Sequence, residues 1–179
     1  MLESLHNPWR GRGMGLDAPM PLDDAGGVAR LLALCPAHQV TPLREMPGLA
    51  AELGIARLLL KDERDRMGLG SFKALGAAHA IAREARETGA GDLRDALAGR
   101  VYVTASAGNH GLSVAAGARL FGARAVIFLA GTVPEAFARR LGDKGAEVVR
   151  AGDDYEGSMQ AAAQAANAKG WTLLSDSSW

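Results

Sequence analysis

Short apolar runs alternate with longer segments of helical periodicity along the chain from residue 57 onward. Each apolar run has the length of a strand, and each longer segment has the length of a helix. The predicted strands are residues 57–61, 101–104, 124–129, 147–150 and 171–174. The predicted helices are residues 72–88, 109–121, 134–143 and 154–169. Residues 90–99 are predicted to form a polar connection.

This alternation predicts an α/β fold, in which right-handed crossovers place helices on both faces of a sheet. The run AVIFL at 125–129 is apolar throughout, as expected of a strand that is buried on both faces. We therefore expect a three-layer sandwich with a mostly parallel sheet. Such sheets bind ligands at the carboxyl ends of their strands, so the segment that follows the strand 101–104 should lie at the ligand edge.

The first part of the chain is less regular than the rest. Its first 22 residues are rich in Gly and Pro and are predicted to form an irregular entry segment. One short helix is predicted over 24–34, opened by Asp23 or Asp24. A second is predicted over 47–53 and should end at Gly54.

The composition is that of an ordinary globular protein, with 48% hydrophobic and 22% charged residues among 179. This length suits one domain. Twenty basic residues balance 20 acidic ones, so we expect no binding of nucleic acid or of an anionic membrane. Arg64 and Arg66 form a local basic cluster, but acidic residues interleave with them, and we interpret the cluster as a solvated surface.

The single cysteine, Cys35, cannot form an intramolecular disulfide, which fits a reducing cytoplasm. No apolar stretch has the length of a membrane span, and the first residues do not resemble a signal peptide. These features together predict a cytoplasmic protein.

The candidate chemistry begins at Ser71-Phe72-Lys73, where a loop becomes the predicted helix 72–88. Cations are not favoured at a helix N-terminus, so a lysine at this place is unusual. A lysine that forms an imine should lie near a helix start, among apolar neighbours and away from carboxylates. A Walker phosphate loop is excluded, because it needs Gly before the lysine and Ser or Thr after it, where Phe72 and Ala74 stand.

The second candidate is the run SAGNHG at 106–111, where a strand becomes a helix. Its glycines allow close backbone approach, and the N–H groups at a helix start suit a carboxylate or a phosphate. A capped turn without a ligand is the alternative interpretation. A nicotinamide-binding turn is disfavoured, because the glycine spacing is wrong and no acidic residue ends the next strand.

The histidines and Asp176 are further polar candidates. The four histidines have no metal-ligand spacing with one another or with the cysteine, and His110 is the one expected to orient the 106–111 loop. Asp176 follows the last predicted strand and should also reach the ligand edge, either as a functional carboxylate or as part of a turn.

In the two motifs at 71–73 and 106–111, the chain resembles the tryptophan-synthase-β-like, fold-type II pyridoxal-phosphate enzymes. That family includes threonine and serine dehydratases and diaminopropionate ammonia-lyase. The resemblance rests on SFK at 71–73 and SAGNHG at 106–111, and it covers roughly residues 40–179. Finer features resemble the diaminopropionate ammonia-lyases, namely KDE at 61–63, RMGL at 66–69 and DSSW at 176–179.

The resemblance implies pyridoxal 5′-phosphate as cofactor and a small amino acid as substrate. Lys73 would hold the cofactor as an imine and then remove the substrate α-proton, with Phe72 against the pyridine ring and Asn109 bonded to the ring hydroxyl. The loop that would grip the substrate carboxylate consists of Ser106, Ala107, Gly108, Asn109 and His110. An α,β-elimination would then yield a 2-oxo acid and ammonia.

One position departs from the pattern of the diaminopropionate ammonia-lyases. They are expected to carry an aspartate directly before Gly-Asn-His, and Ala107 stands there in this chain. Racemases of the family place a hydroxyl at this position, whereas threonine dehydratases commonly have alanine. Because no proton donor then lies opposite Lys73, we expect elimination on L-amino acids without racemisation.

In this family a glycine-rich loop later in the chain holds the cofactor phosphate, and no such loop occurs up to Trp179. The chain is therefore expected to be an N-terminal fragment, with residues 1–60 contributing to the larger domain and residues 61–179 forming the smaller one. We expect the full-length form to be a homodimer and the 179-residue chain to bind the cofactor weakly or not at all. The alternative is a non-catalytic α/β module or half-enzyme that pairs with a companion chain.

Overall fold

The computed structural model describes Pro8, Gly11 and residues 25–176. Its centre is a parallel four-stranded sheet in the order β5-β4-β3-β6. The strands are β3 (Val101–Ala105), β4 (Arg124–Leu129), β5 (Glu147–Arg150) and β6 (Thr172–Leu173). Each strand agrees with its predicted span to within one residue at either end.

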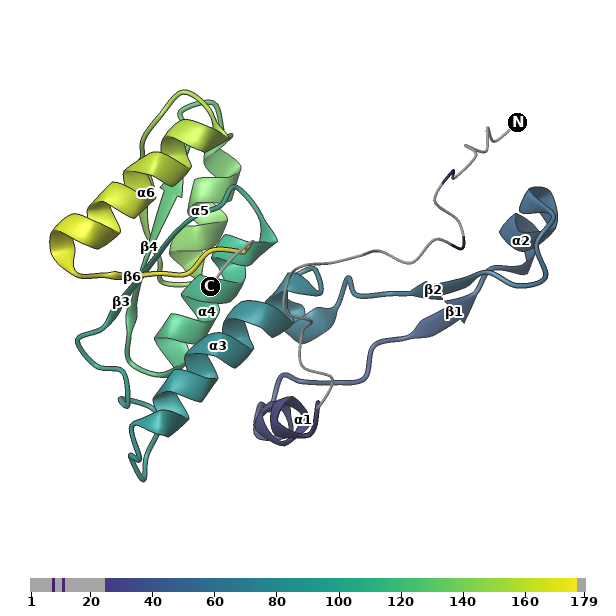
Figure 1. The fold of residues 1–179 in the computed structure, drawn as a ribbon, viewed down its shortest axis with the longest axis horizontal. Helices are drawn as coiled ribbons and strands as arrows, with labels where there is room; N and C mark the ends of the chain where they lie inside the picture. Colours follow the sequence, from purple (N-terminus) through teal and green to yellow (C-terminus); the bar gives the residue numbers. More distant parts are fainter. Residues whose placement is uncertain (1–7, 9–10, 12–24, 177–179) are drawn as a thin grey trace.

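Helices cover both faces of this sheet (Figure 1). On one face lie α4 (Asn109–Leu120) and α5 (Glu135–Asp143), with α3 (Lys73–Glu87) packed against α4. The other face is covered by α6 (Tyr155–Lys169). The predicted α/β sandwich with a parallel sheet is thus confirmed. None of the described helices is both long enough and apolar enough to cross a membrane.

The side chains of the central strands alternate between the two helical layers. Tyr102 and Ile127 pack on the side of α3 and α4, while Val103 packs against the alanines of α6. Gly117 allows α4 to approach α3 closely, since a Cβ there would lie 3.0 Å from Cδ1 of Ile81. Burial of these apolar side chains is the main stabilising contribution to the body of the protein.

The strand predicted at 57–61 does not join the parallel sheet. It is β2 (Leu59–Lys61), which pairs antiparallel with β1 (Leu43–Glu45) in a separate two-stranded ribbon. Between them lies α2 (Pro47–Leu53), which ends at Gly54 as predicted, with a left-handed φ of +65°. Hydrophobic periodicity predicts a strand but not its partner, and β1 is the strand nearest to β2 in the sequence.

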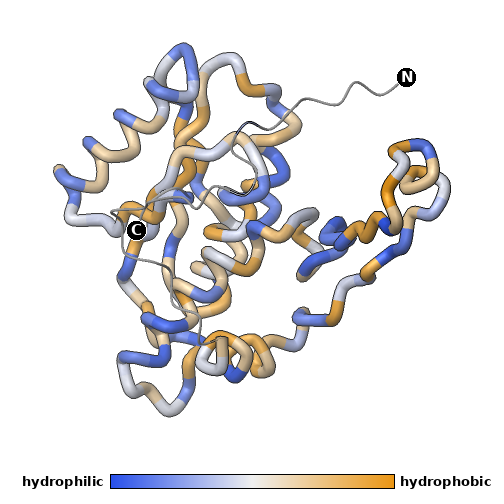
Figure 2. The backbone as a smooth tube through the Cα atoms, turned by 45° about the vertical axis from the view of Figure 1, so that its right-hand side comes forward, coloured by the Kyte–Doolittle hydropathy of each residue, from blue (hydrophilic) through white to orange (hydrophobic). Residues whose placement is uncertain are grey.

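We call β1, α2 and β2 the arm, which projects away from the parallel sheet (Figure 1). Hydrophobic stretches run along it in Figure 2. Several large apolar side chains of the arm are between 42% and 63% exposed, namely Leu43, Leu53, Ile55, Leu59 and Leu60. A two-stranded ribbon is marginally stable in water, so the arm depends on contacts at its base.

An N-terminal helix and one connection complete the fold. The first helix, α1 (Gly26–Leu32), is shorter than the predicted span 24–34, and the predicted caps Asp23 and Asp24 lie outside the described residues. Residues 90–99 form turns, consistent with the predicted connection, and Leu97, which is 1% exposed, anchors them in the core.

Candidate cofactor and substrate site

Lys73 is the first residue of α3 and follows a tightly turned loop. This loop contains a short 3-10 turn, η1 (Arg66–Gly68), which the sequence did not predict. The backbone is left-handed at Met67 and at Gly70, with φ of +52° and +91°. A left-handed φ is unfavourable for Met, so its surroundings must hold the loop in place. Ser71 Oγ accepts a hydrogen bond of 3.3 Å from the Lys73 N–H and so helps to begin the helix.

The second candidate segment forms the turn between β3 and α4. Ser106 Oγ accepts hydrogen bonds from the N–H groups of Gly108 at 3.3 Å and Gly111 at 3.1 Å. The Ser106 hydroxyl therefore shapes the turn and is largely buried. Position 111 favours glycine, because a Cβ there would lie 3.2 Å from both the Ser106 carbonyl oxygen and Cδ2 of Leu141, which is a tight contact. The start of α4 still presents other backbone N–H groups, such as that of Asn109, to an anion.

These two segments lie together in space. Ser71, Phe72 and Lys73 share with residues 106–110 a hollow of about 340 Å³, whose other walls are Tyr155 and Asp176. A hydrogen bond of 3.1 Å from the Ser113 hydroxyl to the Ala74 carbonyl ties α4 to the residue after Lys73. The parallel sheet thus brings the lysine and the SAGNHG loop to one edge, where the topology leads us to expect a ligand.

A second hollow adjoins the first on the side of α3. It has a volume of about 410 Å³ and is also bordered by Phe72 and Lys73, with small residues of α3 such as Gly76 and Ala77 in its wall. The Phe72 side chain is 62% exposed. Its ring is therefore available to pack against a flat ligand.

The Lys73 ammonium forms an ion pair with the carboxylate of Asp176. This contact contradicts the expectation that the lysine would lie away from carboxylates. The reason is topological: β6 lies beside β3, so the residues that follow β6 emerge next to the start of α3. The two side chains are 38% and 28% exposed, so the pair is partly open to solvent.

The charges at this edge act on Asp176. The hydrogen bond from Lys73, above all, holds the pKa of the Asp176 carboxyl below its ordinary value, while partial burial acts in the opposite direction. The carboxylate is therefore ionised at neutral pH. The rest of the segment predicted to reach this edge, residues 177–179, lies outside the described residues.

His110 lies in the first turn of α4 and is 5% exposed. Its Nε2 is 2.9 Å from the carbonyl oxygen of Leu174, the residue that follows β6. The side chain therefore holds the far end of the chain against α4. His110 also borders the hollow, and its part in the grip on a substrate carboxylate stays a prediction.

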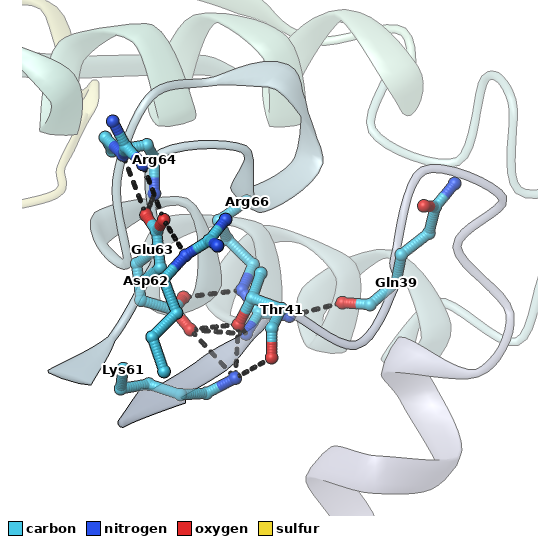
Figure 3. A network of polar contacts seen from close by, with 8 residues as sticks. Gln39, Thr41, Lys61, Asp62, Glu63, Arg64 and Arg66 are labelled. Carbon is cyan, nitrogen blue, oxygen red and sulfur yellow. Dashed lines mark hydrogen bonds and ion pairs between the residues drawn. The ribbon is translucent and has the colours of Figure 1, made fainter. Parts of the chain in front are cut away.

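A second charged cluster lies at the base of the arm (Figure 3). We call Thr41, Lys61, Glu63 and Arg66 the clasp. Arg66 donates through Nε and Nη2 to the two carboxylate oxygens of Glu63, at 2.6 and 2.7 Å. Its Nη1 donates to the Gln39 carbonyl at 2.8 Å, and its Nη2 also donates to the Thr41 hydroxyl at 2.7 Å. The Thr41 hydroxyl in turn donates to Glu63 and accepts from Lys61.

The clasp corrects the interpretation of Arg64 and Arg66 as a solvated surface. Arg64 is indeed 79% exposed, but the Arg66 side chain is only 7% exposed. Asp62, at 8%, is buried between Arg64 and Arg44. Interleaved charges in a sequence do not reveal which of them face inward, and here the base of the arm folds them together.

Hydrogen bonds in this region stabilise the ionised carboxylates. Those from Arg66 and then Thr41 lower the pKa of Glu63 to about 2. Those from Arg64 and Arg44 hold the pKa of Asp62 far below its usual range. Both carboxylates therefore remain charged throughout the physiological range.

Tyr155 was missed by the sequence reasoning. It is the first residue of α6 and lines the hollow beside Asp176. A usable signal was present, because Asp154 caps this helix by accepting from the Gly157 N–H at 2.8 Å. A helix that begins directly after β5 must begin at the carboxyl edge of the sheet.

The hollow has the parts that a flat aldehyde cofactor needs. An amine, an exposed aromatic ring and the Asn109 side chain lie around one space. These residues therefore fit the ring portion of pyridoxal phosphate. Within the described part of the chain, no group of three or more His, Cys, Asp or Glu side chains could hold a metal ion.

Comparisons with known proteins agree with this geometry. The family model for pyridoxal-phosphate dependent enzymes matches residues 34–178. A diaminopropionate ammonia-lyase from Salmonella typhimurium is 30% identical over 157 residues, which cover 80% of this chain and 39% of that protein. An L-serine dehydratase/L-threonine deaminase from Mus musculus is 32% identical over 139 residues, which cover 77% of this chain and 39% of that protein.

Solved structures are also similar. The holo diaminopropionate ammonia lyase from Escherichia coli superposes with a TM-score of 0.77 at 29% identity, over 85% of this chain and 41% of that one. The chain thus spans about 39% of the length of these two curated relatives.

Proposed function

The chain belongs to the family of pyridoxal-phosphate-dependent enzymes, and on that premise we propose that it forms part of an enzyme that catalyses α,β-elimination on a small amino acid. The products would be a 2-oxo acid and ammonia. Relatives named as a diaminopropionate ammonia-lyase and as a serine and threonine dehydratase support this reaction class. The observation that carries the proposal is the hollow that Lys73 shares with residues 106–110.

In this proposal Lys73 would hold the cofactor covalently through its amine. Once the substrate amino group has taken the place of the lysine on the cofactor, the freed Lys73 amine would take the proton from the substrate α-carbon. The exposed ring of Phe72 packs against the cofactor ring, and the Asn109 amide hydrogen-bonds to a ring substituent. When bound, the cofactor withdraws electrons from the α-carbon and makes its proton more acidic.

The substrate carboxylate would be bound by the backbone of the loop together with the Ser106 hydroxyl. Ser106 Oγ accepts from the Gly108 and Gly111 N–H groups, which leaves its hydrogen to donate to the carboxylate, while His110 Nε2 is paired with the Leu174 carbonyl. The N–H groups of Ala107 and Asn109 lie at the start of α4, where the helix dipole favours an anion. Gly108 provides room for the ligand to approach the backbone.

Asp176 would be the second acid–base group of the reaction. Its carboxylate contacts the Lys73 amine, so a proton can pass between the two groups. Elimination needs such a transfer, because an amine or hydroxide leaving group departs more easily once it has gained a proton. Lys73 would thus take the proton and Asp176 would help to return it to the leaving group.

Ala107 would restrict the enzyme to L-amino acids, since this position offers no side-chain acid on the side of the hollow opposite Lys73. The test uses the full-length protein and compares turnover of L- and D-diaminopropionate and of L- and D-serine. We expect the D-isomers to react at least tenfold more slowly, and Ala107→Asp to narrow that gap. Equal turnover of both isomers by the unmutated protein would contradict this assignment.

The domain assignment is also a proposal. Residues 1–60 would belong to a larger domain and residues 61–179 to a smaller one, with the full-length enzyme acting as a homodimer in the cytoplasm. The exposed apolar side chains of the arm support this division, because such a surface favours burial against further protein.

The same exposed arm favours a second candidate, a half-enzyme that pairs with a companion chain. The two candidates differ in what completes the cofactor site. If a separately encoded chain restores tight cofactor binding to residues 1–179, the half-enzyme is supported. If only a longer form of the same polypeptide does so, the single-chain enzyme is supported.

The central experiment identifies the lysine that reacts with the cofactor. The full-length protein is incubated with pyridoxal phosphate, reduced with borohydride and mapped by mass spectrometry. Four lysines of residues 1–179 compete, namely Lys61, Lys73, Lys144 and Lys169. We expect labelling at Lys73 to exceed that at each of the other three at least fivefold, and Lys73→Arg to abolish this excess. Equal labelling of all four lysines would overturn the proposed function.

A further inference from the structure

Leu174 is held in place by hydrogen bonds from two different elements. Its N–H donates to the Val103 carbonyl of β3 at 2.9 Å, and its carbonyl lies 2.9 Å from His110 Nε2 on α4. Its side chain is buried in the core. β6 is two residues long and pairs with β3, so the chain leaves the sheet at this point.

The chemistry of this contact determines the tautomer of His110. A carbonyl oxygen only accepts hydrogen bonds, so Nε2 must carry the hydrogen. The same N–H cannot also donate to a substrate carboxylate in good geometry. The Nε2–H of His110 is therefore committed to the protein rather than to a ligand.

The segment held by this bond leads directly to the site. Asp176 follows Leu174 by two residues, a span of at most about 7 Å of extended chain. A displacement of the Leu174 carbonyl would therefore shift the start of the short segment that carries the carboxylate in contact with Lys73. We propose that His110 is a positioning residue, which holds Leu174 in the place from which Asp176 meets the Lys73 amine.

This inference deepens the proposed function and relies on it for the chemical meaning of the Lys73–Asp176 pair. The alternative is that His110 only fills space in the core beside α4. Phenylalanine, which has a ring of similar size but no N–H, would then serve as well as histidine. Glutamine can present an amide N–H at nearly the position of Nε2, so it should preserve the bond.

The experiment titrates Asp176 by carboxyl ¹³C NMR in the labelled 179-residue chain, without any cofactor. It compares the unmutated chain with His110→Gln and His110→Phe, and includes His79→Gln as a control histidine on α3. Both His110 variants are uncharged, so they differ in the hydrogen bond and not in direct charge. We expect a lowered Asp176 pKa in the unmutated chain, in H110Q and in H79Q, and a rise toward the ordinary value of about 4 in H110F.

Two results would overturn the inference. One is the same Asp176 titration in H110F as in H110Q. The other, which needs no variant and decides the matter if H110F does not fold, is a ¹⁵N spectrum of the unmutated chain in which Nδ1 rather than Nε2 carries the hydrogen. The lysine labelling tests the proposed function separately, because unselective labelling would contradict that function and leave the role of His110 standing.

Discussion

The clasp and the Lys73–Asp176 pair are both built from opposite charges, but they differ in how completely the cation is surrounded. In the clasp, all three guanidinium nitrogens of Arg66 donate, and its side chain is 7% exposed. The Lys73 ammonium meets one carboxylate, and its side chain is 38% exposed. The clasp should be a permanent structural contact, because separating a buried guanidinium from its partners has a large free-energy cost. The Lys73–Asp176 pair allows the amine to exchange its partner for a ligand.

The strongest test of this contrast removes the guanidinium of the clasp. Arg66→Met leaves Glu63, whose side chain is only 17% exposed, without its principal partner, which is costly. We expect the unfolding temperature, measured by circular dichroism, to fall by about 6–12 °C. The matched control is Arg64→Met, since Arg64 is 79% exposed and Asp62 keeps Arg44. If the unfolding temperature fell equally in both variants, the burial of Arg66 would not explain its contribution to stability.

A smaller loss is expected when the hydroxyl at the centre of the clasp is removed. Thr41 is 5% exposed, and its hydroxyl contacts Lys61, Glu63 and Arg66. Thr41→Val keeps the shape and leaves the charged groups to pair with one another, so Tm should fall by about 3–6 °C. Thr132→Val, at an exposed threonine, is the control and should change Tm by about 1 °C at most. Equal effects would mean that the hydroxyl is not central.

Acid should weaken the clasp in a defined direction. The folded pKa of Glu63, about 2, lies below its ordinary value of 4.5. The stabilisation from ionised Glu63 is therefore fully present above about pH 4.5 and is lost as the pH falls toward 2. We expect the Tm difference between the unmutated chain and Glu63→Gln to shrink steadily from pH 5 to pH 3. Glu45→Gln, at the exposed pair with Arg57, should give a small difference throughout. If the Tm difference between the unmutated chain and Glu63→Gln grew in acid, the lowered pKa of Glu63 would be contradicted.

The sequence predicted the sheet better than it predicted the arm. Strand–helix alternation was enough for β3 to β6, because each strand is an apolar run followed by a crossover helix. It predicted the strand β2 but not its place in a separate ribbon, because the antiparallel partner β1 is only three residues long and has no hydrophobic period of its own. Turn chemistry was more reliable, as at Gly54, where a left-handed residue ends a helix.

The candidate site was partly predictable for the same reason. Parallel strands bring the segment after β3 to the ligand edge, so the hollow at residues 106–110 follows from topology. The ion pair of Lys73 with Asp176 depends on which strand β6 joins, and local sequence does not contain that information. The clasp depends on a contact between Thr41 and Arg66, which are 25 positions apart, so local sequence could not predict it either.

The smallest effect on stability, and the sharpest test of the contrast, should come from Asp176→Asn. Both partners are partly exposed, so the loss of this ion pair should change Tm by no more than about 2 °C. The Lys73 amine is then released from its carboxylate, and the rate of its reductive labelling by pyridoxal phosphate should rise about two- to fivefold. Asp92→Asn, at the exposed pair with Arg94, should leave the labelling rate of Lys73 unchanged. A fall in Tm as large as that of Arg66→Met, with no change in labelling, would mean that the Lys73–Asp176 pair is as structural as the clasp.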